Sequence, residues 1–234
     1  IAHNSSRFDQ ILINRTLGSE DFQKQKIIDT SSIKLIPKSL EIFLTQSFNF
    51  CCPLCDKREE KGGKKNFFGC PHYPSLKTID SLNHLQSSLD NLTNELKSSA
   101  KTSQELNTLF SPLSKWIRTK WVGKTESEYD EILEKLTKKQ SFCYSYVKNE
   151  EVLEEEKLPP IEEWQDSYLD NKKPTTEAEV KEANEMFNFA GCKKIGDFYD
   201  FYLRIDVELL CCVFESWRKL GKDNFSLDPV HYVS

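Results

Sequence analysis

The sequence contains no long apolar run and no pattern typical of a secretion signal. No stretch reaches the roughly 18 consecutive apolar residues of a transmembrane helix, so we expect no membrane partner. The N-terminus also lacks the basic cluster and apolar segment that a secretory signal requires. An initiator Met is missing as well, because the first residue is Ile1, and we therefore expect an internal piece of a longer polypeptide.

A strong positive charge is also missing. The net charge of −5 at pH 7 excludes nucleic-acid binding by bulk electrostatics alone, although a locally basic groove is still compatible with it. The 8 Cys residues are too sparse for a disulfide scaffold, so we expect an intracellular, reducing compartment. With 234 residues, of which 38% are hydrophobic, the chain can bury the core of one large domain or two small ones.

The chain alternates between strand-sized and helix-sized segments. Residues 9–50 hold short apolar stretches that suit strands, although residues 10–14 also suit a helix. Residues 51–73 form a charged, Cys-rich insertion, and an apolar pattern resumes at residues 76–82 as if a sheet had been interrupted. Helical spacing of apolar residues predicts helices at 87–96, 128–136, 177–190 and 195–220. We therefore predict an α/β fold with a helix-rich C-terminal half.

Two acidic residues at opposite ends of the sequence are candidates for a shared metal site. Asp9 follows an aromatic residue at the edge of an apolar run. Tyr202 and Asp206 are four positions apart in the last predicted helix, which places the hydroxyl and the carboxylate on the same face. Such a pair can hold a divalent metal through the Asp while the Tyr orients a bound water. An exposed Asp beside a core Tyr is the simpler reading of that spacing.

The order of short motifs along the chain carries a family resemblance. Asn4-x3-Phe8-Asp9 comes first, "DSLNHL" follows at residues 80–85, and Tyr202-x3-Asp206 comes last. This order resembles the second and third exonuclease motifs of family B DNA polymerases, above all those of the protein-primed subfamily of Polinton-type transposons and related viruses. Flanking segments such as "KLPPIEEW" and "LDPVHYVS" resemble their counterparts too, so the resemblance extends over residues 1–234 apart from the insertion and parts of the middle.

The resemblance implies a 3′–5′ exonuclease of ribonuclease-H-like fold that hydrolyses the 3′-terminal phosphodiester of single-stranded DNA. In the family pattern Asp9 and Asp206 would bind two Mg²⁺ or Mn²⁺ ions, and Tyr202 would position the nucleophilic water. The ions would stabilise the attacking and leaving oxygens of an in-line displacement. The residues that would contact DNA by the same resemblance are Asn4, Phe8, Ser81, Leu82 and Lys139.

Two further motifs connect the chain to the protein-primed subfamily. Ser81-Leu82-x2-Leu85 resembles a motif that contacts single-stranded DNA and the terminal protein. Lys139-x2-Phe142 resembles a Lys-x2-hydrophobic motif, although a pattern of two letters is common. The expected partners are therefore the DNA 3′ end, the primer-template, the terminal priming protein and the remainder of a polymerase chain.

The chain also departs from the family pattern. The first exonuclease motif, an Asp-x-Glu pair that would lie upstream of Asp9, is not in the sequence, and neither are polymerase palm motifs. About half the charge of the metal site would therefore be missing. We expect a partial exonuclease domain, truncated at its N-terminus, that is inactive or nearly so as an isolated fragment.

The Cys-rich insertion at residues 51–73 predicts a zinc-binding hairpin. Two ligand pairs are separated by a charged stretch that contains Gly62 and Gly63, and soft or borderline ligands of this kind suit a tetrahedral structural Zn²⁺. Metal binding can supply the folding free energy that so small a core lacks. Free thiols in a loop are the alternative, and Cys51 could replace the first ligand. The expected ligands are Cys52, Cys55, Cys70 and His72.

Aromatic and cationic residues interleave in "KWIRTKWVGK", residues 115–124. Such a stretch can stack bases and neutralise phosphates, but an amphipathic helix that buries its Trp residues has the same composition. Two functions are therefore to be compared: the exonuclease region of a replicative polymerase, and a zinc-containing module that binds nucleic acid or protein without catalysis. The first requires Asp9 and Asp206 to face one cavity, and the second does not.

Overall fold

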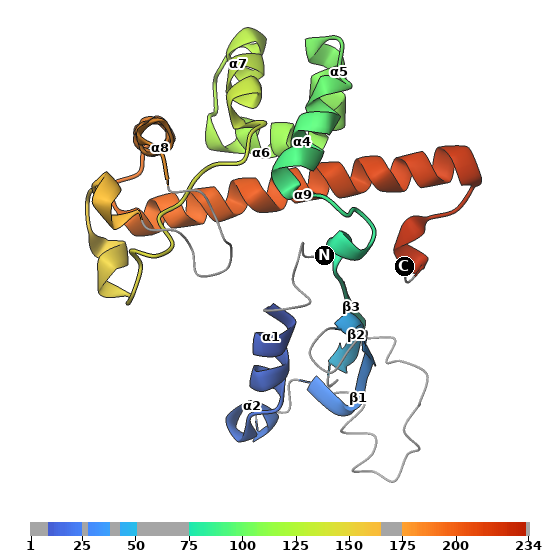
Figure 1. Ribbon diagram of the computed structural model, residues 1–234. Helices are drawn as coiled ribbons and strands as arrows, with labels where there is room; N and C mark the ends of the chain where they lie inside the picture. The colour runs from blue at the N-terminus through green and yellow to red at the C-terminus, as the bar shows by residue number, and fades with distance from the viewer. Residues whose placement is uncertain (1–8, 25–27, 38–42, 51–74, 165–174, 233–234) are drawn as a thin grey trace. The chain divides into compact units, whose positions relative to one another are not determined.

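The computed structural model describes residues 9–24, 28–37, 43–50, 75–164 and 175–232 (Figure 1). The chain is mixed α/β and helix-rich, with a three-stranded antiparallel sheet, as the sequence predicts at this level. It divides into two compact units. We call Ile1–Ser88 with Arg218–Ser234 the sheet unit and Leu89–Trp217 the helical unit. In the described ranges, no helix combines the length and the apolar composition that spanning a bilayer requires.

The sheet unit begins with two helices and continues into the sheet. Its elements are α1 (Asp9–Leu17), α2 (Glu20–Lys24), β1 (Ile28–Pro37), β2 (Phe43–Phe50), β3 (Ser75–Ile79) and the 3₁₀ helix η2 (Ser81–Asn83). The strand order is β1-β2-β3, and both pairs are antiparallel. β1 is a single strand, and its register against β2 shifts between Asp29 and Lys34.

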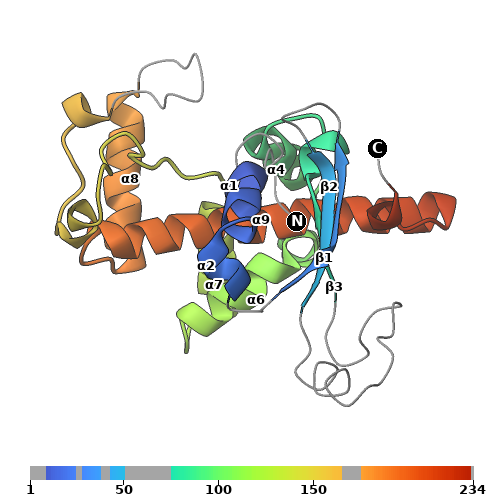
Figure 2. The ribbon, with the colours of Figure 1, turned by 90° about the horizontal axis from the view of Figure 1, so that it is seen from below.

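The helix α1 replaces the first strand-sized piece of the sequence, so the helical alternative for residues 10–14 is confirmed. Ile13 and Leu17 are four positions apart and therefore share one face of α1. This face packs against the sheet, where Leu17, Ile28 and Phe48 are buried together. Figure 2 shows α1 beside the sheet, seen nearly edge-on.

β3 confirms that the Cys-rich insertion interrupts a sheet. Thr45 of β2 pairs with Ile79, and Asn49 pairs with Ser75, so the chain rejoins its neighbouring strand directly after residues 51–74. The zinc-hairpin prediction concerns residues 51–73, of which the structure describes none.

The helical unit contains most of the regular structure. Its elements are α4 (Leu89–Ser98), α5 (Ser103–Leu109), α6 (Ser111–Lys120), α7 (Glu126–Leu136), the 3₁₀ helices η3 (Glu151–Glu154) and η4 (Ile161–Glu163), α8 (Glu177–Ala190) and most of α9 (Ile195–Phe225). The four helices predicted from periodicity correspond to α4, α7, α8 and α9.

Local sequence signals explain where these helices begin and end. Thr125 starts α7 and Thr176 starts α8, each in a capping box with a Glu three positions later. Gly191 ends α8 with φ of 72°, a left-handed conformation that favours glycine and matches the predicted cap. The turn after Gly191 therefore leads directly into α9.

The long helix α9 supplies one wall of the core of the helical unit. Figures 1 and 2 both show α6 beside α9, and the rings of Trp116 and Phe201 are 5.9 Å apart between them. Fully buried side chains from α6, α7 and α9 fill this core, and they include Leu113, Ile117, Leu133, Leu136, Phe198, Ile205 and Leu209. The core fixes which face of α9 points outward, and so the placement of Tyr202 and Asp206.

The last turns of α9 belong to the sheet unit and hold the C-terminal segment. The guanidinium of Arg218 donates two hydrogen bonds to Asp228, of 3.0 and 2.6 Å, and Lys222 Nζ lies 3.0 Å from the same carboxylate. Asp228 Oδ1 also accepts from the backbone N–H of Val230. Arg218, above all, holds the pKa of Asp228 well below its usual value. These contacts fold the chain back at η5 (Pro229–His231).

Replacing Gly221 with Ala should detach this segment. A Cβ atom at Gly221 would lie 2.5 Å from Pro229 Cγ and 3.1 Å from the carbonyl oxygen of Leu227. Overpacking of this kind costs about 1–3 kcal/mol, more than the better helix propensity of Ala returns. Hydrogen exchange should rise at residues 226–232 in Gly221→Ala. The neighbouring exposed substitution Leu220→Ala should leave exchange unchanged, and equal exchange in both variants would contradict this packing.

Candidate functional site

Tyr202 and Asp206 meet on α9 as their spacing predicts. The hydroxyl of Tyr202 donates a hydrogen bond of 2.7 Å to Asp206 Oδ2. Tyr202 is only 3% exposed, and Asp206 is partly buried. The simpler reading, an exposed Asp beside a core Tyr, is therefore wrong for Asp206. The convergence of phenol and carboxylate is confirmed.

The second carboxylate oxygen of Asp206 is the unusual feature of this pair. Oδ1 is buried and has no hydrogen-bond partner among the residues that the structure describes. Burial raises the pKa of Asp206, while the bond from Tyr202 and the charge of Lys139 oppose that rise. An ionised carboxylate with one buried, unpartnered oxygen is costly to keep in a fold. Its free lone pairs fit a divalent cation, for which carboxylate oxygens are the preferred ligands.

Aromatic rings surround the hydroxyl of Tyr202. Phe142 lies 5.5 Å from the Tyr202 ring centroid, and Tyr144 lies 5.7 Å away in an edge-to-face arrangement. Burial, followed by the charge of Asp206, raises the pKa of Tyr202 far above its usual value. Burial also raises the pKa of Tyr144 to about 12. Both phenols therefore keep their protons at neutral pH and can act only as neutral donors or acceptors.

Both residues of the Lys139-x2-Phe142 pattern lie near the Tyr202–Asp206 pair. The Phe142 ring packs on Tyr202, and the positive charge of Lys139 acts on Asp206. Lys139 is exposed, so it can approach a phosphate as well as the carboxylate. The structure thus brings together four of the residues that the sequence singled out, and it adds Tyr144, which the sequence did not. In the sequence, the alternation of aromatic residues at Phe142, Tyr144 and Tyr146 is the signal that could have pointed to Tyr144.

The Ser81-Leu82 motif lies in the sheet unit, in the 3₁₀ helix η2. Asp80 begins this helix, and its Oδ1 accepts a hydrogen bond of 3.0 Å from the backbone N–H of Leu82. Asp80 and Ser81 are both fully buried, and Leu82 is partly exposed. Of this motif, Leu82 and Leu85 are the residues whose side chains are partly exposed and can meet a ligand.

The remaining predicted residues fall outside the described part. Asn4, Phe8 and the four expected zinc ligands lie in undescribed ranges, and Asp9 begins α1 without a described side chain. Within the described ranges no group of three or more His, Cys, Asp or Glu is suited to hold a metal ion. Among the described residues, Asp206 has a free carboxylate oxygen that could serve as one ligand of a divalent cation, and a complete site would need further ligands.

Tyr202→Phe should lower the unfolding free energy, because Asp206 then loses its hydrogen-bond donor. The substitution keeps the ring but removes the hydrogen bond to Oδ2, which leaves both oxygens of Asp206 without one among the described residues. We expect a loss of about 1–3 kcal/mol in unfolding free energy at pH 7, shrinking as Asp206 protonates.

Denaturant titration followed by Trp fluorescence measures this loss, because all four Trp residues lie in the helical unit. Tyr199→Phe is the matched control, since the hydroxyl of Tyr199 makes no hydrogen bond within the described ranges. Equal stability of the two variants would contradict a structural role for the Tyr202–Asp206 bond.

Comparison of the chain with protein-family models, with curated proteins and with solved structures finds no match. Two features of the chain bear on its function: the geometry around Asp206, with its buried oxygen and its Tyr202 donor, and the order of the short motifs along the sequence.

Proposed function

We propose that this chain is the 3′–5′ proofreading exonuclease region of a protein-primed family B DNA polymerase. The observation that carries the proposal is the buried, unpartnered Oδ1 of Asp206, held beside the Tyr202 hydroxyl in the described part of α9. A purely structural carboxylate at this position would be expected to have its oxygens hydrogen-bonded. A metal-binding carboxylate leaves an oxygen free for the ion.

In this proposal the residues divide the work of phosphodiester hydrolysis. Asp206 and, by the resemblance, Asp9 would hold the divalent ions. When bound, Mg²⁺ or Mn²⁺ would supply Lewis-acid stabilisation of the attacking and leaving oxygens. Tyr202 holds its proton and points its hydroxyl at Asp206, so it can orient a water near the carboxylate. Lys139 would contribute positive charge to the DNA phosphate.

The finer fold and the partners follow from the same proposal. The described elements would belong to a ribonuclease-H-like domain, in which the family resemblance puts an Asp-x-Glu pair before Asp9. Asn4, Phe8 and Leu82 would contact the single-stranded 3′ end, with Ser81 supporting that motif from its buried position. The primer-template, a terminal protein and the remainder of the polymerase chain would be the partners.

The insertion between β2 and β3 would carry a structural Zn²⁺ on Cys52, Cys55, Cys70 and His72. Structural zinc sites use four protein ligands and leave no open position, so this metal would not take part in cleavage. Non-denaturing mass spectrometry of the reduced protein should show one bound zinc, which Cys55→Ser should remove. Metal-free wild-type protein would contradict the site.

The test of the proposed function is cleavage of a 5′-labelled single-stranded DNA. The protein should be expressed with its reading frame continued upstream, so that an Asp-x-Glu pair is included. We expect Mg²⁺-dependent shortening from the 3′ end, and a loss of about 1,000-fold or more in Asp206→Ala, because a metal ligand in a two-metal site is removed.

Asp223→Ala is the matched control. Asp223 is an exposed carboxylate on the same helix and should be replaceable without loss of cleavage. If Asp206→Ala and Asp223→Ala degrade DNA at the wild-type rate, Asp206 has no catalytic role. The zinc-containing binding module would then be the better description of the chain.

A further inference from the structure

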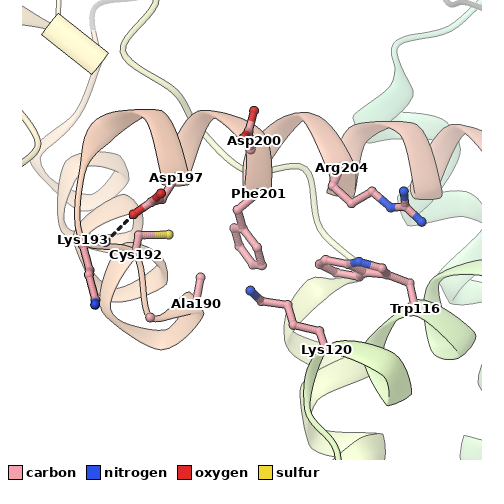
Figure 3. Close-up of a pocket in the computed structure, with 10 residues that line it drawn as sticks. Trp116, Lys120, Ala190, Cys192, Lys193, Asp197, Asp200, Phe201 and Arg204 are labelled. Carbon is pink, nitrogen blue, oxygen red and sulfur yellow. Dashed lines mark hydrogen bonds between the residues drawn. The ribbon is translucent and has the colours of Figure 1, made fainter. Parts of the chain in front are cut away.

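A cavity of about 600 Å³ lies in the helical unit, apart from the Tyr202–Asp206 pair. It is bounded by the end of α6, the turn from α8 into α9 and the first turns of α9 (Figure 3). None of the residues assigned above to metal or DNA by the family resemblance lines it. Its lining includes Trp116, Lys120, Lys193, Asp200, Phe201 and Arg204.

Aromatic rings form one side of this cavity. Trp116 and Phe201 lie 5.9 Å apart and are tilted by 42°, and Trp121 meets Trp116 edge to face at the same distance. The two indoles are only partly buried, so the alternative in which residues 115–124 bury their Trp residues holds in part. Trp116 packs in the unit and still offers ring surface to the cavity.

Positive charges lie beside these rings. Lys120 Nζ is 5.4 Å from the Phe201 centroid and 5.3 Å from that of Trp121, both within cation–π range. Within the described ranges, the ammonium groups of Lys120 and Lys193 make no ion pair. Figure 3 shows the amine of Lys120 next to the ring of Phe201.

A third cation stands on the opposite side of the rings. Arg204 Cζ is 5.9 Å from the Trp116 centroid, and its guanidinium is held by Glu208 at 2.6 Å. A guanidinium has five N–H donors, so this ion pair leaves donors for another acceptor. In Figure 3, Lys193 lies at one end of the group and Arg204 at the other, with the rings between them.

The acidic residues of the cavity, Asp197 and Asp200, offset only part of these charges, because the lining has three cations. Asp197 accepts hydrogen bonds from the backbone N–H groups of Lys193 and Lys194, and these bonds hold its pKa below its usual value. The carboxylate of Asp197 therefore caps the first turn of α9. Asp200 points away from Phe201 and Lys120 in Figure 3. The side that faces the rings is cationic and aromatic.

We propose that this cavity binds a nucleotide unit of single-stranded DNA, with the base stacked on the partly exposed ring of Trp116, which the buried Phe201 supports, and the flanking phosphates on Lys120, Lys193 and Arg204. Aromatic rings with adjacent cations are the combination that binds single strands without reading sequence. Cations at both ends of the rings favour a strand, whose backbone continues past one base, over a free nucleotide. The cavity would be a DNA-binding site additional to the exonuclease residues.

Fluorescence anisotropy of the 234-residue chain with a labelled dT oligonucleotide of about 12 residues tests the proposal. Trp116→Leu should weaken binding about 10-fold, because one stacked base is lost. Lys120→Gln should reduce the slope of log Kd against log salt by about 0.7, as expected for one lost phosphate contact on a single strand. Lys120 is exposed, so this variant should fold.

Lys115→Gln is the matched control, because Lys115 is an exposed cation on the same helix that does not line the cavity. Its affinity and salt slope should equal those of the wild type. If Trp116→Leu and Lys120→Gln both bind the oligonucleotide with wild-type affinity, the proposal is wrong. Competition by dTMP as effective as that of the oligonucleotide would overturn the assignment of a strand, leaving a mononucleotide site.

The outcome is separable from that of the exonuclease proposal. The two proposals rest on different residues, since neither Tyr202 nor Asp206 lines the cavity. Binding lost in Asp206→Asn but kept in the two cavity variants would place the strand at the exonuclease residues alone, against this inference. Cleavage that fails while the cavity variants still lose binding would leave the inference standing.

Discussion

Asp206→Asn should stabilise the helical unit at pH 7. Asn keeps an acceptor for the Tyr202 hydroxyl and puts a neutral amide where the structure has a buried, unpartnered carboxylate oxygen. An unpaired buried charge costs more than an unpaired neutral group, so we expect a gain on the order of 1 kcal/mol. Stabilisation that accompanies loss of cleavage is the signature of a residue kept for function.

The pH dependence of that gain follows from the pKa of Asp206. Burial raises this pKa above its ordinary value of 3.8. At a pH between the unfolded-state pKa and the native pKa, the native protein therefore binds more protons than the unfolded chain. Wild-type stability must therefore fall as pH rises from 3.8 through the native pKa. The Asn variant lacks this slope, so its advantage should be full at neutral pH and disappear near pH 3.8. An advantage that grows on acidification would contradict the assignment.

Phe142→Ala should have the largest effect on stability. Phe142 is 8% exposed, and its ring meets four aromatic rings within 6.0 Å, those of Tyr144, Phe198, Tyr199 and Tyr202. Truncation of a buried Phe costs about 3–5 kcal/mol, from lost burial and from the cavity left behind. Guanidinium titration followed by Trp fluorescence should show this loss in the helical unit.

Phe142→Leu provides the graded comparison. Leu fills part of the space and should cost clearly less than Ala, because the residual cavity is smaller. Both variants should also reduce cleavage, since the Phe142 ring supports Tyr202 at a centroid distance of 5.5 Å. Ala and Leu variants as stable as the wild type would show that the aromatic cluster is not part of the core.

The sequence predicted features that depend on neighbours along the chain. The convergence of Tyr202 on Asp206 follows from helix geometry alone. Gly191 and the Thr176–Glu179 capping box likewise define α8 through local contacts. The return of the chain to the sheet at β3 was readable because an apolar pattern stops at residue 50 and resumes after the insertion.

Features that depend on packing between distant segments were not predicted. Tyr144 reaches Tyr202 only because the irregular segment after α7 lies against α9, and periodicity carries no signal for such a contact. The cavity joins α6 to the turn between α8 and α9, more than 60 residues later in the sequence. Residues 10–14 were ambiguous because a short apolar run suits a strand and a helix equally.

The most direct test of the central claim is a Mn²⁺ titration, by electron paramagnetic resonance, of the protein with its reading frame continued upstream. We expect Asp206→Asn to lose Mn²⁺ that the wild type binds, and a variant at the exposed Asp223, Asp223→Asn, to bind Mn²⁺ as the wild type does. If Asp206→Asn and the wild type bind the same number of Mn²⁺ ions with the same affinity, the buried oxygen of Asp206 is not a metal ligand and the nuclease proposal fails.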